Sequence, residues 1–187
     1  MKTKFWKTGL KIVFFLGIII AALWLSYTAI ENELIQELVL KYGYGGVFLT
    51  SLFSGFNIIA PIPIISFLPL FIVSGLNLWI IIFTIAVGLT LADSFSYFIG
   101  KVGQQLISPP MQKTVRRLEK IRKRYNWLPI ATLFLFASFV PFPNEILVIP
   151  MVFLGYRISH LLPSLFFGNM IFNSLSALGI INLFKLI

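Results

Sequence analysis

The chain has 187 residues, of which 58% are hydrophobic and only 11% are charged, and its net charge is +9. This composition is typical of an integral membrane protein, and the length suits one membrane domain. The chain has no cysteine, which excludes disulfides, iron–sulfur clusters and thiol catalysis, and its single histidine argues against a histidine-based metal site. The basic residues gather in two short stretches beside apolar segments, which is a signal of membrane orientation rather than of nucleic-acid binding.

The first predicted element is a transmembrane helix over residues 8–30. Four lysines lie among the first eleven residues, and an uncharged run follows from Ile12 to Ile30. A signal peptide would share the basic start and the apolar middle, but this run is long and no small-x-small cleavage site follows it. We therefore favour a retained helix. A short interfacial helix is expected next, where leucine and isoleucine recur at helical spacing among three glutamates until Gly43, Gly45 and Gly46 break it.

Two apolar segments, 44–75 and 127–156, are each interrupted by a Pro-x-Pro turn, and we call them the first and second broken segments. The prolines are Pro61 and Pro63 in the first segment and Pro141 and Pro143 in the second. A shift of 80 positions, which we call the repeat shift, maps the first pair onto the second and Gly75 onto Gly155. Each second proline lies 12 steps before its glycine, about 18 Å of helix, whereas a span needs roughly 20 residues. We therefore interpret both segments as re-entrant helical hairpins.

The surroundings of the two turns indicate a transporter. Both turns are apolar, and irregular backbone at membrane depth is tolerated only inside protein or against a water-filled cavity. Two such breaks in corresponding positions of two repeats are typical of a transporter's substrate site.

An uncharged or nearly uncharged run follows each broken segment, and we predict transmembrane helices over 77–100 and 158–184. The segment 101–126 between the repeats is strongly basic and amphipathic, and we interpret it as a helix on the surface of anionic lipid that signals orientation. The basic stretches place the N-terminus and this segment in the cytoplasm, so that the C-terminus would lie outside unless the last helix breaks near Asn173. The two hairpins would then enter from opposite faces.

The predicted fold class is therefore an all-α integral membrane domain. It is an inverted repeat of two re-entrant helical hairpins, each followed by a transmembrane helix, with an additional N-terminal transmembrane helix. The turns of the two hairpins are expected to meet near the middle of the membrane.

Two runs of residues carry a family resemblance that covers roughly residues 40 to 180. One is Pro141-Phe-Pro143-Asn144-Glu145, and the other is Asp93-Ser-Phe-Ser-Tyr97-Phe-Ile-Gly100-Lys101. The chain resembles the DedA/VTT superfamily of membrane proteins, also called SNARE-associated proteins. The second run is similar to the family's Gly-Asp…Tyr-x-x-Gly-Arg/Lys element, with Ala92 in place of the first glycine. The resemblance implies lipid translocation, since bacterial members return undecaprenyl phosphate across the membrane and eukaryotic relatives scramble phospholipids.

The chain departs from the family's pattern at three further positions. Many bacterial members carry Phe-x-Arg-Phe-x-Pro-x-x-Arg in the second hairpin, and Ser138 and Asn144 stand here at the two arginine positions. An acidic residue often found in the first hairpin corresponds to Ile65 or a neighbour. Substrate identity and proton coupling therefore do not carry over from the resemblance.

Glu145 and Asp93 are the leading candidates for a polar functional centre. A charge at the centre of a membrane helix costs about 2.5–3.5 kcal/mol on insertion scales, so a carboxylate in such a place is a functional hypothesis by default. Glu145 is a candidate proton carrier; the alternatives are a helix cap or an ion pair with Arg157. Asp93 is either a second functional carboxylate or a structural residue bonded to Tyr97 or Asn173.

Other polar residues are weaker candidates. Lys101 and Arg157 either attract a phosphate head group or extend to the membrane interface. Asn57 and Asn144 lie beside their proline turns, where they can bind substrate or satisfy freed backbone groups. We interpret His160 as an interfacial residue. Asn169 and Asn173 lie four residues apart on one helix face, which favours interhelical hydrogen bonds for both.

The residues argue against an enzyme. Intramembrane serine proteases need Gly-x-Ser-Gly and a partner histidine, but Ser54 and Ser74 lack the leading glycine and His160 is the only histidine. Lipid phosphatases need a histidine pair with arginines, and alcohol-phosphate transferases need several aspartates, of which this chain has one. We therefore expect no catalysis, no metal and no cofactor.

The expected function is a DedA-like transporter, a multi-pass protein of the cell membrane that moves undecaprenyl phosphate or a phospholipid between leaflets, with or without proton coupling. The alternative is a proton-coupled carrier of a small solute. The expected partners are membrane lipids, not nucleic acid, and self-association into a homo-oligomer is left open.

Overall fold

The computed structural model describes residues 13, 17–18, 20–22, 24–56, 63–103 and 127–184, and its regular elements in these ranges are all helical. Residues 24–30 are helical, in agreement with the end of the predicted helix over 8–30. The remainder of that prediction falls largely outside the described residues. Asn57, Pro61 and almost all of the basic segment 101–126 also lie outside them.

The first broken segment is preceded by a kink at Gly43. Helix α2 (Glu33–Ser54) begins after Asn32, whose side chain accepts hydrogen bonds from the backbone N–H groups of Leu34 and Ile35 and so caps the helix. Within α2 the backbone leaves the helical region at Gly43, with φ 50° and ψ −140°. This conformation suits glycine because it has no Cβ. The predicted break is therefore confirmed at Gly43, whereas Gly45 and Gly46 lie within the helix. Residues 44–54 form the first limb of the first broken segment.

The remaining helices appear in the same order in both halves of the chain. After the first limb come the 3₁₀ helix η1 (Ile64–Phe67), α3 (Leu68–Val73) and the long helix α4 (Leu78–Gly103). The second half contains α6 (Leu128–Phe139), α7 (Glu145–Phe153) and the long helix α8 (Ile158–Phe184). The starts of the two long helices, Leu78 and Ile158, are related by the repeat shift.

The two halves also share the same glycine turn between the short helix and the long one. Gly75 and Gly155 have φ of +91° and +75°. In the first turn, the N–H of Gly75 donates to the carbonyl of Ile72 at 2.9 Å, and the N–H of Leu76 donates to that of Phe71 at 3.1 Å. The second turn repeats both bonds at the corresponding positions, at 2.8 and 3.1 Å. This is a Schellman motif, in which a left-handed glycine ends one helix and redirects the chain.

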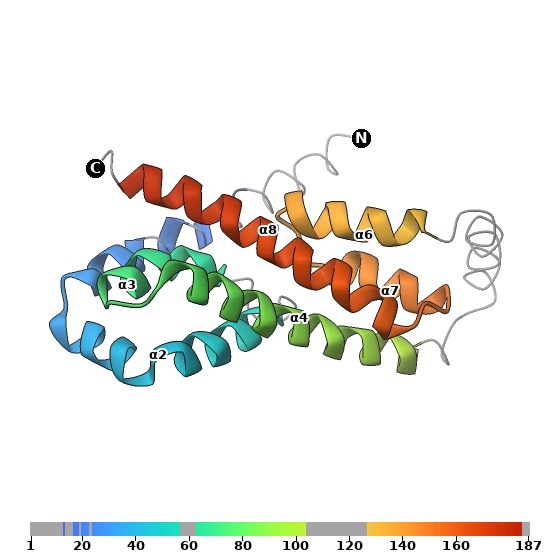
Figure 1. Cartoon of the computed structure of the whole chain (residues 1–187), viewed down its shortest axis with the longest axis horizontal. Coiled ribbons are helices and arrows are strands. Elements are labelled where there is room, and N and C mark those ends of the chain that lie inside the picture. Colours follow the sequence, from blue (N-terminus) through green and yellow to red (C-terminus); the bar gives the residue numbers. More distant parts are fainter. Residues whose placement is uncertain are drawn as a thin grey trace.

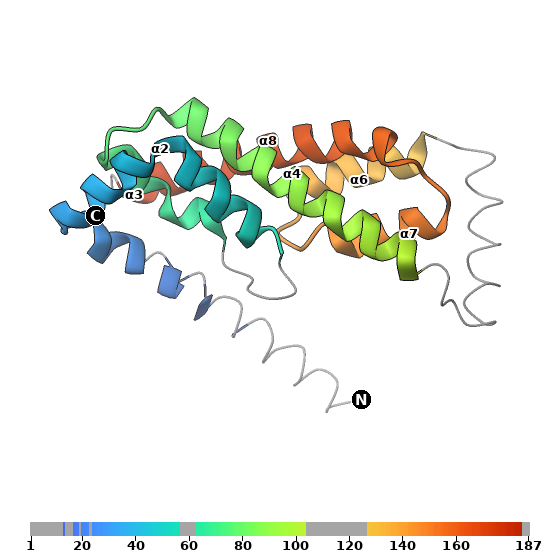
Figure 2. The same cartoon turned by 90° about the horizontal axis from the view of Figure 1, so that it is seen from below.

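The helices of the two halves are interleaved. The first limbs pack on the long helix of their own half, α2 along α4 and α6 along α8. The short helices cross over, since α7 packs against α4, whereas η1 and α3 contact α8. The two long helices pack together and run in opposite directions, and each short helix returns from the middle of the molecule toward one end (Figures 1 and 2).

Glycine allows the first limbs to approach the long helices closely. A Cβ at Gly88 of α4 would overlap the Ser51 hydroxyl of α2 and would lie 3.0 Å from the backbone of Phe48 and Leu52. Gly168 is the counterpart of Gly88 under the repeat shift, and a Cβ there would lie 2.5 Å from the Cβ of Ala137 on α6. Small residues at helix crossings are typical of packing between membrane helices.

Two apolar clusters form the core. The first joins η1, α3 and α4 to Ala177 of α8, and the second joins α6 and α7 to Leu161 and Leu165 of α8. Large apolar side chains also cover the outer surface, including Trp79, which is 66% exposed, and Phe167, which is 57% exposed. Such an exterior is compatible with lipid rather than water around the long helices.

Two helices of the described chain are long and apolar enough to span a membrane. They are Leu78–Gly103 and Ile158–Asn182, which correspond to the predicted spans over 77–100 and 158–184. The apolar helices Ile64–Val73 and Leu128–Phe139 are shorter, and at about 1.5 Å per residue neither reaches the ~30 Å of a hydrocarbon core. The all-helical fold class is therefore confirmed, together with two candidate spans.

Candidate functional site

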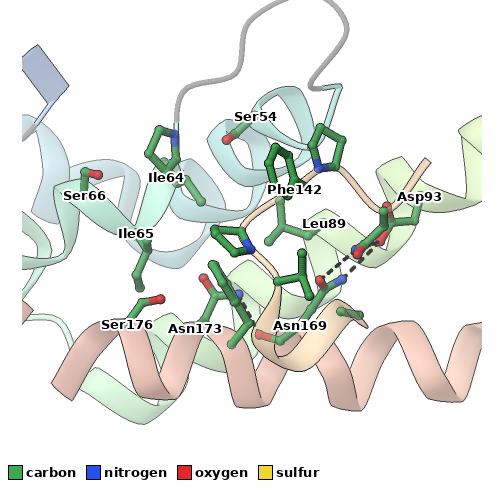
Figure 3. Close-up of a pocket in the computed structure, with 18 of the residues that line it drawn as sticks. Ser54, Ile64, Ile65, Ser66, Leu89, Asp93, Phe142, Asn169, Asn173 and Ser176 are labelled. Carbon is green, nitrogen blue, oxygen red and sulfur yellow. Dashed lines mark hydrogen bonds between the residues drawn. The ribbon is translucent and has the colours of Figure 1, made fainter. Parts of the chain in front are cut away.

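The inner ends of the two broken segments border one cavity of about 410 Å³ (Figure 3). Most of its lining is apolar, and the polar side chains come mainly from the long helices. The described lining consists of Ser54, Gly55, Pro63, Ile64, Ile65 and Ser66 from the first broken segment, Leu89 and Asp93 from α4, Ala137, Val140, Pro141, Phe142, Pro143 and Asn144 from the second broken segment, and Asn169, Phe172, Asn173, Ser176, Gly179 and Ile180 from α8.

The second Pro-x-Pro turn places an asparagine at this cavity. Val140 ends α6 in an extended conformation, with φ −107° and ψ 118°, because the following proline disfavours helical backbone. The chain then turns over Phe142 and begins α7 at Glu145. Asn144 occupies the N-cap position of α7, but its side chain makes no capping hydrogen bond. The side chain is therefore available to reach α4 and α8.

Asp93, Asn144 and Asn169 form a partly buried hydrogen-bond network that joins three helices. The Nδ2 group of Asn144 donates to Asp93 Oδ2 at 2.9 Å and to Asn169 Oδ1 at 3.1 Å. The Nδ2 group of Asn169 donates to the same Asp93 oxygen at 3.2 Å and to the hydroxyl of Thr90 at 3.2 Å. Asp93 is only 3% exposed. A carboxylate that accepts from two amides is held in a fixed position at the cavity wall.

Glu145 lies next to this network but does not line the cavity. Its side chain is 5% exposed, and neither carboxylate oxygen has a hydrogen-bond partner in the described part of the chain. Ser96 of α4 lies close to the carboxylate without hydrogen-bonding geometry, and Asp93 is near enough for the two negative charges to repel. Neither a cap nor an ion pair with Arg157 holds Glu145, so both structural alternatives predicted for it are wrong.

The predicted structural partners of Asp93 are also different from those observed. The hydroxyl of Tyr97 donates to the backbone carbonyl of Tyr156 at 3.1 Å, and Asn173 donates to the carbonyl of Asn169 at 2.7 Å. Asp93 instead takes Asn144 and Asn169 as its partners. The interhelical role predicted for Asn169 is confirmed, whereas the bond that Asn173 donates stays within α8.

The structure brings some of the predicted site residues together and separates others. Asp93, Asn144 and three of the four turn prolines line the cavity, and Glu145 adjoins it. Lys101 and Arg157 are exposed and do not line it, and His160 is exposed as well. The interpretation of Asn144 as a residue that satisfies freed backbone groups is wrong, because its amide bonds to side chains of other helices.

Sequence reasoning missed Thr90 and did not connect Asn169 with Asp93. The two residues of that pair are 76 positions apart, and only the antiparallel packing of α4 and α8 brings them into contact. One signal was available, since polar side chains on apolar membrane helices usually find a partner on a neighbouring helix.

The cavity offers no evident metal site in the described residues. No group of three or more histidine, aspartate or glutamate side chains gathers there in a geometry that could hold a metal ion.

Comparisons of the chain with protein-family models, with curated proteins and with solved structures found no match.

Proposed function

We propose that this chain is a DedA-like membrane protein that moves a phosphate-bearing lipid between the two leaflets of a cell membrane. The observation that carries the proposal is the cavity between the inner ends of the two broken segments, with a single carboxylate–amide network in a mostly apolar wall. Such a cavity can shield a polar head group while the acyl or prenyl chain stays in lipid. Part of the two runs that resemble the DedA/VTT superfamily, namely Asp93 and the turn residues Pro141 and Pro143, lines this cavity.

The arrangement of the helices supports an inverted repeat as the basis of the movement. The antiparallel long helices and the crossed short helices are compatible with two halves of opposite orientation in the membrane. In this proposal the N-terminus is cytoplasmic, the protein crosses the membrane several times, and the broken segments are re-entrant. Rocking of one half against the other would open the cavity to each leaflet in turn.

The exposed cations fit a role outside the cavity. Lys101 follows Asp93 by about two turns of α4, a distance of about 12 Å along the helix. Lys101 and Arg157 would attract phosphate head groups at the cytoplasmic rim, and the cavity would receive them afterwards. Glu145, buried without a partner in the described part of the chain, is the residue best suited to carry a proton if movement is coupled to a proton gradient.

The alternative remains a proton-coupled carrier of a small solute. It is favoured by one observation, namely that the described lining of the cavity contains no lysine or arginine. Such a carrier would use the same carboxylates but would not open toward lipid. We propose no chemical turnover in either case, so that phospholipids and polyprenyl phosphates incubated with the purified protein should remain intact.

Reconstitution into liposomes with lipids labelled in one leaflet tests the function. We expect wild type to move polyprenyl phosphate or phospholipid faster than empty liposomes, and Asp93→Asn and Glu145→Gln to slow this movement. Glu33→Gln is a matched control, because Glu33 is exposed in the first turn of α2. If wild type moves no lipid, the proposed function is wrong. If both variants are as fast as the control, the site is wrong while the function stands.

Cysteine labelling tests the position of the second turn in the membrane. The chain has no cysteine, so a single Phe142→Cys variant gives a clean background. Phe142 is 60% exposed, yet a re-entrant turn should resist a bulky impermeant reagent from either side. Glu31→Cys, at an exposed position, serves as the reactive control. Rapid labelling of both positions would identify the turn as an aqueous loop.

A further inference from the structure

The cavity has a second polar wall, which corresponds to the first under the repeat shift. Asn173 and Ser176 of α8 are the counterparts of Asp93 and Ser96 of α4. Asn173 and Ser176 both line the cavity, and both project from α8 on the side of Ile65 (Figure 3). The repeat has thus produced two polar positions on two antiparallel helices.

The segments that face the two walls correspond as well. Asn144 and Glu145, at the start of α7, lie against α4 at the first wall. Their counterparts in the first half of the chain are Ile64 and Ile65, which pack with Ala177 of α8 in one core cluster. The second wall therefore has the same construction as the first, with isoleucines in place of the asparagine and the glutamate.

The two walls differ in charge. The first contains Asp93 and adjoins Glu145, whereas the second offers an amide and a hydroxyl. Among the described residues that line the cavity, Asp93 is the only one with an ionisable acidic or basic side chain. A phosphate would be repelled at the first wall, because it would meet like charge in a medium of low dielectric constant. At the second wall it would meet groups that can donate hydrogen bonds.

The hydroxyl of Ser176 differs from that of Ser174 on the same helix, because it makes no hydrogen bond to the helix backbone in the described part of the chain. Ser94 and Ser174 each donate to the carbonyl four residues earlier at 2.8 Å, and Ser138 does the same at 2.7 Å. Asn173 uses one N–H for the carbonyl of Asn169, and an amide nitrogen carries two. Both side chains can therefore donate into the cavity.

We propose that Asn173 and Ser176 form the subsite that binds the phosphate of the transported head group. This subsite is the second wall of the cavity, whereas the carboxylates belong to the first wall. The assignment rests on the proposed function for its ligand, a lipid phosphate ester, although free phosphate has the same chemistry. The carboxylates of the first wall then do not contact the phosphate. By electrostatic repulsion the carboxylates keep the phosphate at the second wall, and they remain available to bind a proton.

The test uses the full-length protein in liposomes with Ser176→Ala and Asn173→Asp. Ser176→Ala removes one hydrogen bond to a charged oxygen and should slow lipid translocation about tenfold. Asn173→Asp keeps the shape of the side chain, places a carboxylate on both walls, and should slow it at least as much. Ser174→Ala is the matched control, since its hydroxyl is bonded to the backbone of the same helix. Gel filtration and thermal melts of each variant identify any that fail to fold.

A second arm measures uptake of radiolabelled inorganic phosphate into the same liposomes. Slow lipid movement by both subsite variants, with the Ser174→Ala control at the wild-type rate, supports the subsite. Lipid movement that is equally fast in all variants overturns it and leaves the proposed function intact. Phosphate uptake that depends on Ser176, without lipid movement, supports the subsite and overturns the lipid function.

Discussion

Replacement of Asn144 by alanine should remove the hydrogen bonds that join the start of α7 to α4 and α8, and should destabilise the protein. Asn144 donates at 2.9 Å to the carboxylate of Asp93 and at 3.1 Å to the amide oxygen of Asn169, and alanine makes neither bond. A hydrogen bond to a charged group contributes about 1.5–3 kcal/mol and one to a neutral group about 0.5–1.5 kcal/mol. We expect a loss of about 2–4 kcal/mol, because Asn169 still donates to Asp93 and the site is only partly buried.

The loss can be measured by thermal unfolding in detergent, followed by tryptophan fluorescence. For a chain of this length, 1 kcal/mol corresponds to a shift in Tm of about 2–4 °C, so that Asn144→Ala should lower Tm by roughly 4–16 °C. Asn182→Ala is the matched control, because Asn182 is exposed on α8, and its Tm should change by less than about 2 °C. If the two variants melt together, the network does not hold the second broken segment against α4, and this account of the network is wrong.

Three further substitutions are informative in the same assay. Gly88→Ala should lower the free energy of unfolding by about 1–3 kcal/mol, because the new methyl group overlaps Ser51. Gly179→Ala is the control and should be neutral or stabilising, because nothing lies within 4 Å of a Cβ built there. Equal effects of the two substitutions would contradict the close approach of α2 and α4. Glu145→Met should raise the free energy of unfolding by about 1–3 kcal/mol, because it removes two buried oxygens that lack hydrogen-bond partners among the described residues. The same substitution should slow translocation. A destabilised variant would indicate that Glu145 has a partner. Gly155→Ala should cost about 1–2 kcal/mol because φ is +75°, and an unchanged Tm would argue against the left-handed turn.

Features that depend on neighbouring residues could be predicted from the sequence. The kink at Gly43 and the two long apolar helices follow from local backbone preference and from runs of apolar side chains. The matching glycine turns belong to the same group, since only glycine adopts their backbone conformation without strain. Such signals are carried by a few consecutive residues and need no knowledge of packing.

The partners of the polar residues could not be predicted in this way. Asp93 was a candidate because a lone carboxylate in an apolar helix is costly, but nothing near it in the sequence indicated Asn144 or Asn169. Those contacts join residues 51 and 76 positions apart. The contact with Asn144 depends on the crossing of α7 to α4, and the contact with Asn169 depends on the antiparallel packing of α4 and α8.

The sequence therefore identifies the polar groups that need a hydrogen-bond partner, because burying a polar group among apolar side chains without one costs free energy. Only the tertiary structure shows that Asp93 accepts hydrogen bonds from two amides and that Glu145 has no hydrogen-bond partner among the described residues. It also shows that Lys101 and Arg157 lie outside the cavity. The physical reason is that helix crossing angles and antiparallel packing arise from the fit of whole apolar surfaces. A single polar residue contributes too little to that fit to reveal where it will lie.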